Sequence, residues 1–232
     1  MGFRLWIDSR PDDDPSRYEF LGGEVVMSPP ARSGHGLVGH RLNLLVGRHV
    51  ADGDLGPCFD ASTGFELPTG DTLAPDFAFV SRPRWDAAPK PAPDEFVRVV
   101  PDLVVEVLSP STAKRDREQK RRAYAASGVG EHWLVDPSKR EVRVIDLAQG
   151  PTVAERIVRS GAIVSRVLSS LDVAVEDLFR GFASRNSRSG VRSGPGGTRG
   201  ATASNRRRAF RAAHSQGRPP SGSAQRRRLQ GM

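Results

Sequence analysis

The hydrophobic pattern of this chain switches several times between helical and strand-like periodicity before residue 180. Between residues 35 and 50, apolar positions recur every three or four residues, which predicts a helix that ends at Gly53. Elsewhere, short runs are β-branched or alternate between apolar and polar positions, which is typical of strands. Such runs predict a hairpin at 19–27 and strands at 58–67, 75–80, 103–108, 132–136, 141–145 and 152–158.

A second helix is expected between two of these strands, from 113 to 127, with Ser111 or Thr112 as its N-cap. The Pro-rich segment 83–93 predicts a loop, and residues 173–179 indicate a short last helix. Strands outnumber helices, and the segment around the second helix has the order strand, helix, strand. The pattern therefore predicts an α/β (α+β) domain with one mixed central sheet flanked by helices.

A carboxylate interrupts the most apolar of the predicted strands. Glu106 lies within Leu103-Val104-Val105-Glu106-Val107-Leu108, a run that is short and β-branched enough to be buried on both faces. An isolated ionised carboxylate in such a place is very unfavourable. Glu106 therefore needs partners that hold its charge.

Two further residues are candidates for that role. Asp76 begins the apolar segment 75–80, and Lys120 lies on the helix that follows Glu106. Two acids on neighbouring strands and a lysine from the next helix form a site for a divalent metal and a phosphate. Mg²⁺ needs one or two carboxylates and keeps several waters, and the backbone carbonyl of Val107 could add an oxygen. Lys120 would orient or deprotonate the attacking water, or stabilise charge on phosphorus.

Each of these residues also has an ordinary structural explanation. An Asp after Pro at a strand edge is most often a turn residue, and Lys120 lies in a charged run that otherwise resembles a solvated helix face. Asp116, Lys120 and Tyr124 share one helix face at four-residue spacing. That face points either to solvent or back over the sheet edge, and the sequence leaves both open.

The composition changes sharply after residue 182. Residues 183–232 contain twelve Arg and no Lys, Asp or Glu, and Gly, Ser, Ala and Pro fill most of the remainder. This is the composition of a disordered basic tail, since little apolar surface is available to offset the entropy of ordering. The whole chain carries +8, so residues 1–182 carry −4, with 23 Lys and Arg against 27 Asp and Glu. The basic character belongs to the tail and not to the expected domain.

Cys58 is the only cysteine, which excludes an internal disulfide and a zinc site built from several cysteines. The first eight residues lack an apolar core of signal-peptide length, and no stretch approaches a membrane span. We therefore expect a cytoplasmic protein with no membrane partner.

Several segments together resemble one known family, the Uma-two type "putative restriction endonuclease", a branch of the PD-(D/E)XK nuclease superfamily. The resemblance covers about residues 15–180. It rests on the segment 101–112 with its Glu-Val-Leu-Ser-Pro-Ser stretch, on the downstream Asp116, Lys120 and Tyr124, and on three further segments, 23–30 followed by His35, 75–80 and 128–137.

The resemblance implies a restriction-endonuclease-like fold, Mg²⁺ (or Mn²⁺) held by Asp76 and Glu106, and a nucleic-acid substrate, with double-stranded DNA favoured. The superfamily has a lysine two residues after the glutamate, where this chain has Leu108, so Lys120 on the following helix is the natural substitute. Glu24 and His35 become supporting candidates, together with Tyr124. Asp136 before Pro137 is interpreted as a turn residue and not as a ligand.

The leading hypothesis is a Mg²⁺-dependent DNA endonuclease with a nuclease domain at 1–182 and the disordered tail at 183–232. The alternative is a nuclease-fold protein that binds nucleic acid or a partner without catalysis, since a fold does not fix a function. Hydrolysis of another phosphodiester is a third hypothesis. A homodimer is left open.

Overall fold

The computed structural model describes residues 2–11, 14, 16–28, 30–110, 112–150, 152 and 155–181. The predicted tail at 183–232 and the N-cap candidate Ser111 lie outside the described residues, so neither is tested. No helix in the described ranges has the length and apolar character needed to cross a membrane.

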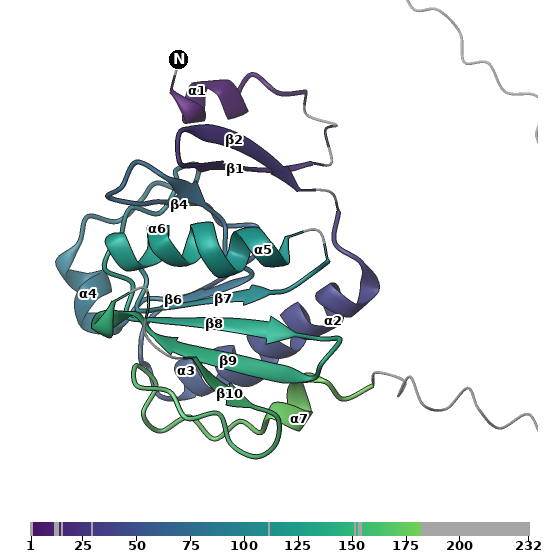
Figure 1. Ribbon diagram of the computed structural model, residues 1–232. Helices are drawn as coiled ribbons and strands as arrows, with labels where there is room; N and C mark the ends of the chain where they lie inside the picture. Colours follow the sequence, from purple (N-terminus) through teal and green to yellow (C-terminus); the bar gives the residue numbers. More distant parts are fainter. Residues whose placement is uncertain are drawn as a thin grey trace, which may run out of the picture. The chain divides into compact units, whose positions relative to one another are not determined.

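The described strands form two sheets, where the sequence predicted one (Figure 1). The larger sheet is mixed, and its parallel pair is formed by β7 and β8. Its strands, in spatial order, are β10 (Arg156–Val158), β9 (Glu141–Asp146), β8 (Glu131–Asp136), β7 (Leu103–Val107), β6 (Phe77–Phe79) and β3 (Cys58–Asp60). The smaller sheet is antiparallel, in the order β2 (Glu24–Ser28), β1 (Arg17–Leu21), β5 (Thr72–Leu73) and β4 (Phe65–Glu66).

The predicted strand 58–67 is wrong as a single element, and this explains the second sheet. A turn separates β3 from β4, where the carboxylate of Asp60 accepts hydrogen bonds from the backbone N–H and the hydroxyl of Ser62. β3 then pairs with β6 in the larger sheet and β4 pairs with β5 in the smaller one. An Asx turn inside an alternating run carries little periodic signal, so the pattern did not reveal the break.

Both long predicted helices are present, and each contains a wide π-helical turn. The first is continuous through α2 (Ser33–Leu42), the π turn Asn43–Gly47 and α3 (Arg48–Asp52), and Gly53 follows it. The second runs through α5 (Ala113–Arg115), the π turn Asp116–Lys120 and α6 (Arg121–Ala126). Such turns are rare and concentrate at functional sites.

The described chain also has three shorter α-helices, α1 (Phe3–Ile7), α4 (Arg82–Ala87) and α7 (Val175–Leu178), and a 3₁₀ helix at Leu147–Gln149. α7 confirms the predicted last helix, whereas α1 and α4 were not predicted. Both have too few residues to show a helical period, and α4 falls in the Pro-rich segment that was predicted to be a loop. Its proline, Pro83, lies in the first turn, where a missing N–H removes no helical hydrogen bond.

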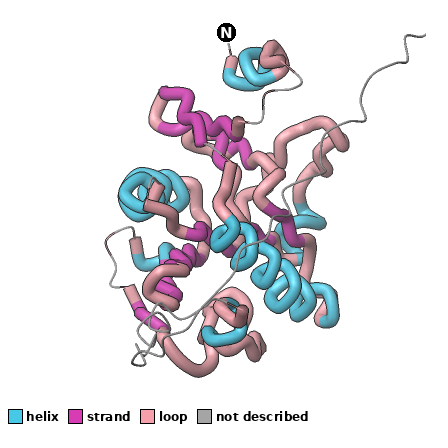
Figure 2. Tube along the Cα trace, turned by 90° about the vertical axis from the view of Figure 1, so that its right-hand side faces the viewer, coloured by secondary structure: helices cyan, strands magenta, loops and turns pink. Residues whose placement is uncertain are grey.

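The larger sheet is covered on both faces, which explains why all five residues of β7 are buried (Figures 1 and 2). On one face, α2, α3 and α7 pack against side chains such as Phe77, Val105 and Trp133. On the other face, α6 and the smaller sheet pack against Ala78, Val104 and Leu134. Glu106 lies two residues after Val104 on β7, so its side chain points to the same face as Val104, the face covered by α6 and the smaller sheet.

Candidate active site

The first two members of the site face each other across β6 and β7. The register pairs Phe77 with Val105, so one residue further along the ladder Asp76 stands opposite Glu106. The backbone N–H of Val107 donates to Asp76 Oδ2 at 2.7 Å. Asp76 and Glu106 are only 4% and 3% exposed. The sheet thus brings together the two acids that the sequence singled out.

The second helix supplies the partners of Glu106. Lys120 Nζ lies 3.0 Å from Glu106 Oε1, and the Tyr124 hydroxyl donates to the same oxygen at 2.6 Å. Lys120 is 2% exposed and Tyr124 is fully buried, so their helix face points to the sheet and not to solvent. This decides between the two orientations that the sequence left open.

A third acid, Glu19 on β1, was not singled out from the sequence. Lys120 Nζ lies 2.8 Å from Glu19 Oε1, which also accepts the backbone N–H of Ala74 at 2.8 Å. The signal was the same as for Glu106. Glu19 shares a strand face with the buried Leu21, and an acid at an inward-facing strand position needs a partner.

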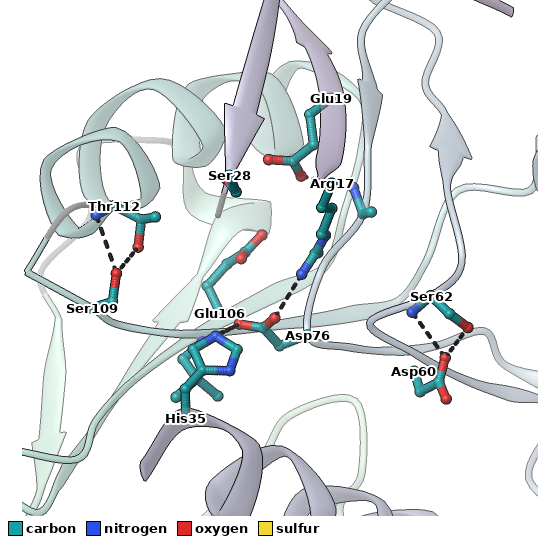
Figure 3. A network of polar contacts seen from close by, with 12 residues as sticks. Arg17, Glu19, Ser28, His35, Asp60, Ser62, Asp76, Glu106, Ser109 and Thr112 are labelled. Atoms are coloured by element: carbon teal, nitrogen blue, oxygen red, sulfur yellow. Dashed lines mark hydrogen bonds and ion pairs between the residues drawn. The ribbon is translucent and has the colours of Figure 1, made fainter. Parts of the chain in front are cut away.

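Asp76 receives two further partners from opposite directions, as Figure 3 shows. Arg17 reaches down from β1 and places Nη1 at 3.1 Å from Asp76 Oδ1. His35, in the first turn of α2, places Nε2 at 3.1 Å from Asp76 Oδ2. Burial alone would raise the pKa of Asp76, but the hydrogen bond from His35 and the charge of Arg17 hold it below its usual value.

The remaining acid of the cluster is Asp116, at the start of the π turn. It is 2% exposed and lies 3.8 Å from Lys120 Nζ, and its Oδ1 has no hydrogen-bond partner. Arg115 next to it lies 3.9 Å from Glu19 Oε2 and donates to the hydroxyl of Ser28 at 2.9 Å. The cluster therefore consists of Glu19, Asp76, Glu106 and Asp116, held by Arg17, His35, Arg115 and Lys120.

Among the buried members of the cluster, the four acids outnumber the one cation, Lys120. Burial lowers the pKa of Lys120, but the carboxylates of Glu106, Glu19 and Asp116 outweigh burial and raise it, so the amine stays charged. Burial raises the pKa of Glu106 to about 8, and neighbouring carboxylates add to the rise against the opposing charge of Lys120. The group of acids thus retains a proton near neutral pH, and we place it on Glu106.

The other sequence candidates have different positions. Glu24 is exposed and pairs with Leu21 beside the hairpin turn, whereas Arg17 and Ser28 form the end of the hairpin that faces the cluster. The structure therefore does not bring Glu24 to the site, and Glu19 on the facing strand is there instead. Val107 contributes its N–H to Asp76, and the role expected for its carbonyl stays a prediction. Asp136 caps the turn after β8 by accepting from Ser138, as interpreted from the sequence.

The donor chemistry fits a hard divalent cation. The acids offer only oxygen ligands, and Asp116 Oδ1 is a buried acceptor without a hydrogen-bond donor. Among the described residues, however, no three His, Cys, Asp or Glu side chains already surround one point as a cage. Asp76 and Glu106 would therefore hold Mg²⁺ in the way that suits this ion, through one or two carboxylates with waters completing the shell.

A cavity of about 500 Å³ lies elsewhere and shares no residue with the cluster. It is lined by the turn between β8 and β9, by Arg159 and by residues around α7. Two of its arginines already have acidic partners, Arg159 with Glu141 and Arg180 with Asp177. We therefore assign the chemistry to the carboxylate cluster and not to this cavity.

Comparisons with known proteins show the family and the fold of this chain. A family model described as "Uma2: Putative restriction endonuclease" matches residues 3–176. An uncharacterized protein, slr1290, of Synechocystis is 28% identical over 173 residues, which span 72% of this chain and 85% of the relative. A solved structure from Anabaena variabilis, described as a putative nuclease belonging to DUF820, superposes with a TM-score of 0.63 at 17% identity. That match covers 77% of this chain and 97% of the solved one, and it shows a shared fold.

Proposed function

This chain belongs to the Uma2 family, and we propose that it is a divalent-metal-dependent endonuclease that hydrolyses phosphodiester bonds of DNA. The observation that carries the proposal is the pairing of Asp76 and Glu106 across β6 and β7, with Lys120 on Glu106. Burying two acids with one ammonium costs free energy, and the fold alone does not require such a group. Such groups concentrate at functional sites.

Asp76 and Glu106 would hold the cation, Mg²⁺ or Mn²⁺, and the carbonyl of Val107 remains a candidate for a further oxygen. Glu19 is a third acid of the cluster, and its carboxylate lies 2.8 Å from Lys120 Nζ. The bound ion would supply Lewis-acid stabilisation of the phosphate and would make a water molecule more acidic.

The charge state of Lys120 narrows its role. Its ammonium is held by three carboxylates, which raise its pKa, so in this arrangement it cannot take a proton from water at neutral pH. It instead holds Glu19 and Glu106 in place and supplies a fixed positive charge beside the position where negative charge would develop on the phosphate. Tyr124 keeps Glu106 in place through its hydroxyl.

The partner in this proposal is double-stranded DNA, and a homodimer would present one cluster to each strand. Residues 1–182 carry a net charge of −4, so the domain would approach DNA through a local basic surface, with the Arg-rich tail adding non-specific affinity. The single cysteine, Cys58, is partly buried and free, which agrees with a cytoplasmic protein.

One observation favours a second candidate, a protein of nuclease fold that binds nucleic acid or a partner without cutting. Both oxygens of Asp76 already have cationic or N–H partners, so this carboxylate is satisfied without an ion. In a binding protein these contacts would be permanent. In an enzyme they would open when the ion enters.

A cleavage assay separates the two. Purified protein is incubated with supercoiled and linear DNA in Mg²⁺ or Mn²⁺, and the wild type is compared with Glu106→Gln. The matched control is Glu24→Gln, since Glu24 is an exposed glutamate of the same domain outside the cluster. The proposal expects metal-dependent cleavage that Glu106→Gln abolishes and Glu24→Gln leaves intact. DNA that binds but stays uncut under all conditions favours the second candidate, and cleavage of RNA in place of DNA would change the substrate.

A further inference from the structure

The members of the carboxylate cluster differ in how far solvent reaches them. The side chains of Glu19, Asp76 and Glu106 are each 4% exposed and that of Lys120 is 2% exposed. The Arg17 side chain, by contrast, is 30% exposed, and His35 is 20% exposed. An ion or phosphate that arrives from solvent therefore meets Arg17 and His35 before it meets the acids.

Arg17 makes few contacts for its position. Its Nη1 bonds Asp76, whereas its Nε and Nη2 are buried and have no hydrogen-bond partner in the described structure. Buried donors of a guanidinium are normally satisfied, because the group offers five N–H donors that match carboxylate or phosphate oxygens. Two nitrogens without acceptors, beside three acids, indicate that the guanidinium contributes its positive charge here and has more N–H donors than its surroundings have acceptors.

Three acids act on this guanidinium at once. Burial lowers the pKa of Arg17, but the charges of Asp76, Glu19 and Glu106 outweigh burial and raise it. Figure 3 shows the same arrangement, with Arg17 descending between Glu19 and the pair formed by Glu106 and Asp76. Its positive charge thus acts on the acids that would share a divalent cation.

We propose that Arg17 is the resident counter-ion of the carboxylate cluster, and that on entry of a divalent cation its guanidinium leaves Asp76 and binds a phosphate oxygen of the nucleic acid. The first half concerns the cation alone. The second half rests on the proposed function, because it needs a phosphodiester ligand.

Arg17 is a better candidate for this exchange than the other cations. Lys120 is enclosed by Glu19, Glu106 and Asp116 and has almost no exposed surface, so it cannot turn outward without leaving three buried acids. His35 offers one nitrogen to Asp76 and lacks the forked donors that bind phosphate. Arg17 has a long side chain, an exposed portion and unused donors.

The test combines two measurements on the full chain of wild type and Arg17→Met. Binding of Mn²⁺ alone is measured by calorimetry, and binding of a short DNA duplex is measured in Ca²⁺. Removing a like charge beside the ion should tighten Mn²⁺ binding by about tenfold or more. The same change should weaken duplex binding by about tenfold, because a charge-assisted contact to phosphate is lost. Arg98→Met is the matched control, since Arg98 pairs with Glu66 on the exposed surface, and both affinities should stay unchanged.

The two halves fail separately. Mn²⁺ affinity that is unchanged or weaker in Arg17→Met overturns the counter-ion role, even if duplex binding falls. Tighter Mn²⁺ binding with unchanged duplex binding overturns the phosphate role. If wild type never cleaves DNA, the Mn²⁺ comparison still stands, so failure of the proposed function is distinguishable. Should Arg17→Met not fold, Arg17→Gln removes the charge while its amide bonds Asp76, and the same two outcomes decide.

Discussion

Replacing Lys120 by Met removes the one ammonium that three buried acidic side chains share. Its Nζ lies 2.8 Å from Glu19, 3.0 Å from Glu106 and 3.8 Å from Asp116. Met fills a similar volume, so the change is chiefly one of charge. Since Glu106 already holds a proton near neutral pH, the variant relieves its excess negative charge by protonating a further acid, for which Glu19 is the closest to the lost amine.

The size of the effect follows from that proton. An ordinary glutamate has a pKa of 4.5, so protonating it at pH 7 costs about 3.4 kcal/mol at about 1.4 kcal/mol per pH unit. This agrees with the range of about 3–5 kcal/mol for breaking a buried ion pair by removing one partner. The extra proton is bound in the folded variant and not in the unfolded chain, so stability must fall as pH rises. We expect losses of about 2 kcal/mol at pH 6, about 3.4 at pH 7 and about 5 at pH 8.

The measurement is urea unfolding of wild type and Lys120→Met at these three pH values. Lys139→Met is the control, because Lys139 is half exposed and lies 4.0 Å from Asp136, and such surface pairs contribute at most about 1 kcal/mol. Adding Glu19→Gln to Lys120→Met should remove most of the pH dependence. A loss that is the same at all three pH values, or that is no larger than in Lys139→Met, would refute the assignment of Lys120 as the shared counter-ion.

Three further predictions concern the acids, the ion and the tail. The pKa of Glu106 is about 8, above its ordinary 4.5, so its protonated form contributes stability that is fully present below pH 4.5 and lost as pH rises through 8. The unfolding free energy of Glu106→Gln minus that of wild type should therefore rise between pH 4.5 and pH 8. A difference that does not change with pH in urea unfolding would contradict the raised pKa. Mg²⁺ or Mn²⁺ should raise the Tm of wild type by binding only the folded form, and Glu106→Gln should reduce that rise, whereas equal rises would place the ion elsewhere. Cutting the chain after residue 182 should leave the fold and the metal-induced Tm rise intact. It should weaken DNA binding chiefly at low salt, because twelve Arg are removed. A DNA affinity that is unchanged at every salt concentration would leave the tail without a role in binding.

The sequence was most informative where burial and charge conflict. Glu106 could be identified because a carboxylate inside a β-branched run violates the hydrophobic pattern, and the structure gives it Lys120 and Tyr124 as partners. Asp76 followed from its place at the start of a neighbouring strand. The two long helices were predicted from their helical periodicity, and most strands of the larger sheet from their β-branched or alternating runs.

What the sequence did not reveal depends on contacts between distant segments. The hairpin at 19–27 was predicted, but nothing local shows that its strands join a second sheet with β4 and β5 and bring Arg17 and Glu19 over the sheet edge. The family resemblance indicated Glu24, and Glu19 was not singled out. The hairpin register decides between them, since Arg17 pairs with Ser28 at the site and Leu21 pairs with Glu24 at the far turn.

The most direct test of the central claim is the position of the cation itself. Crystals of the wild-type protein grown or soaked with Mn²⁺ and measured at the manganese absorption edge give an anomalous difference map that locates the ion. The account predicts a peak bound by the carboxylates of Asp76 and Glu106, at about 2.0–2.4 Å from their oxygens, with Arg17 turned away from Asp76. A manganese peak that is bound elsewhere, or an Asp76 that keeps Arg17 and His35 in saturating Mn²⁺ with no peak beside it, would contradict the account.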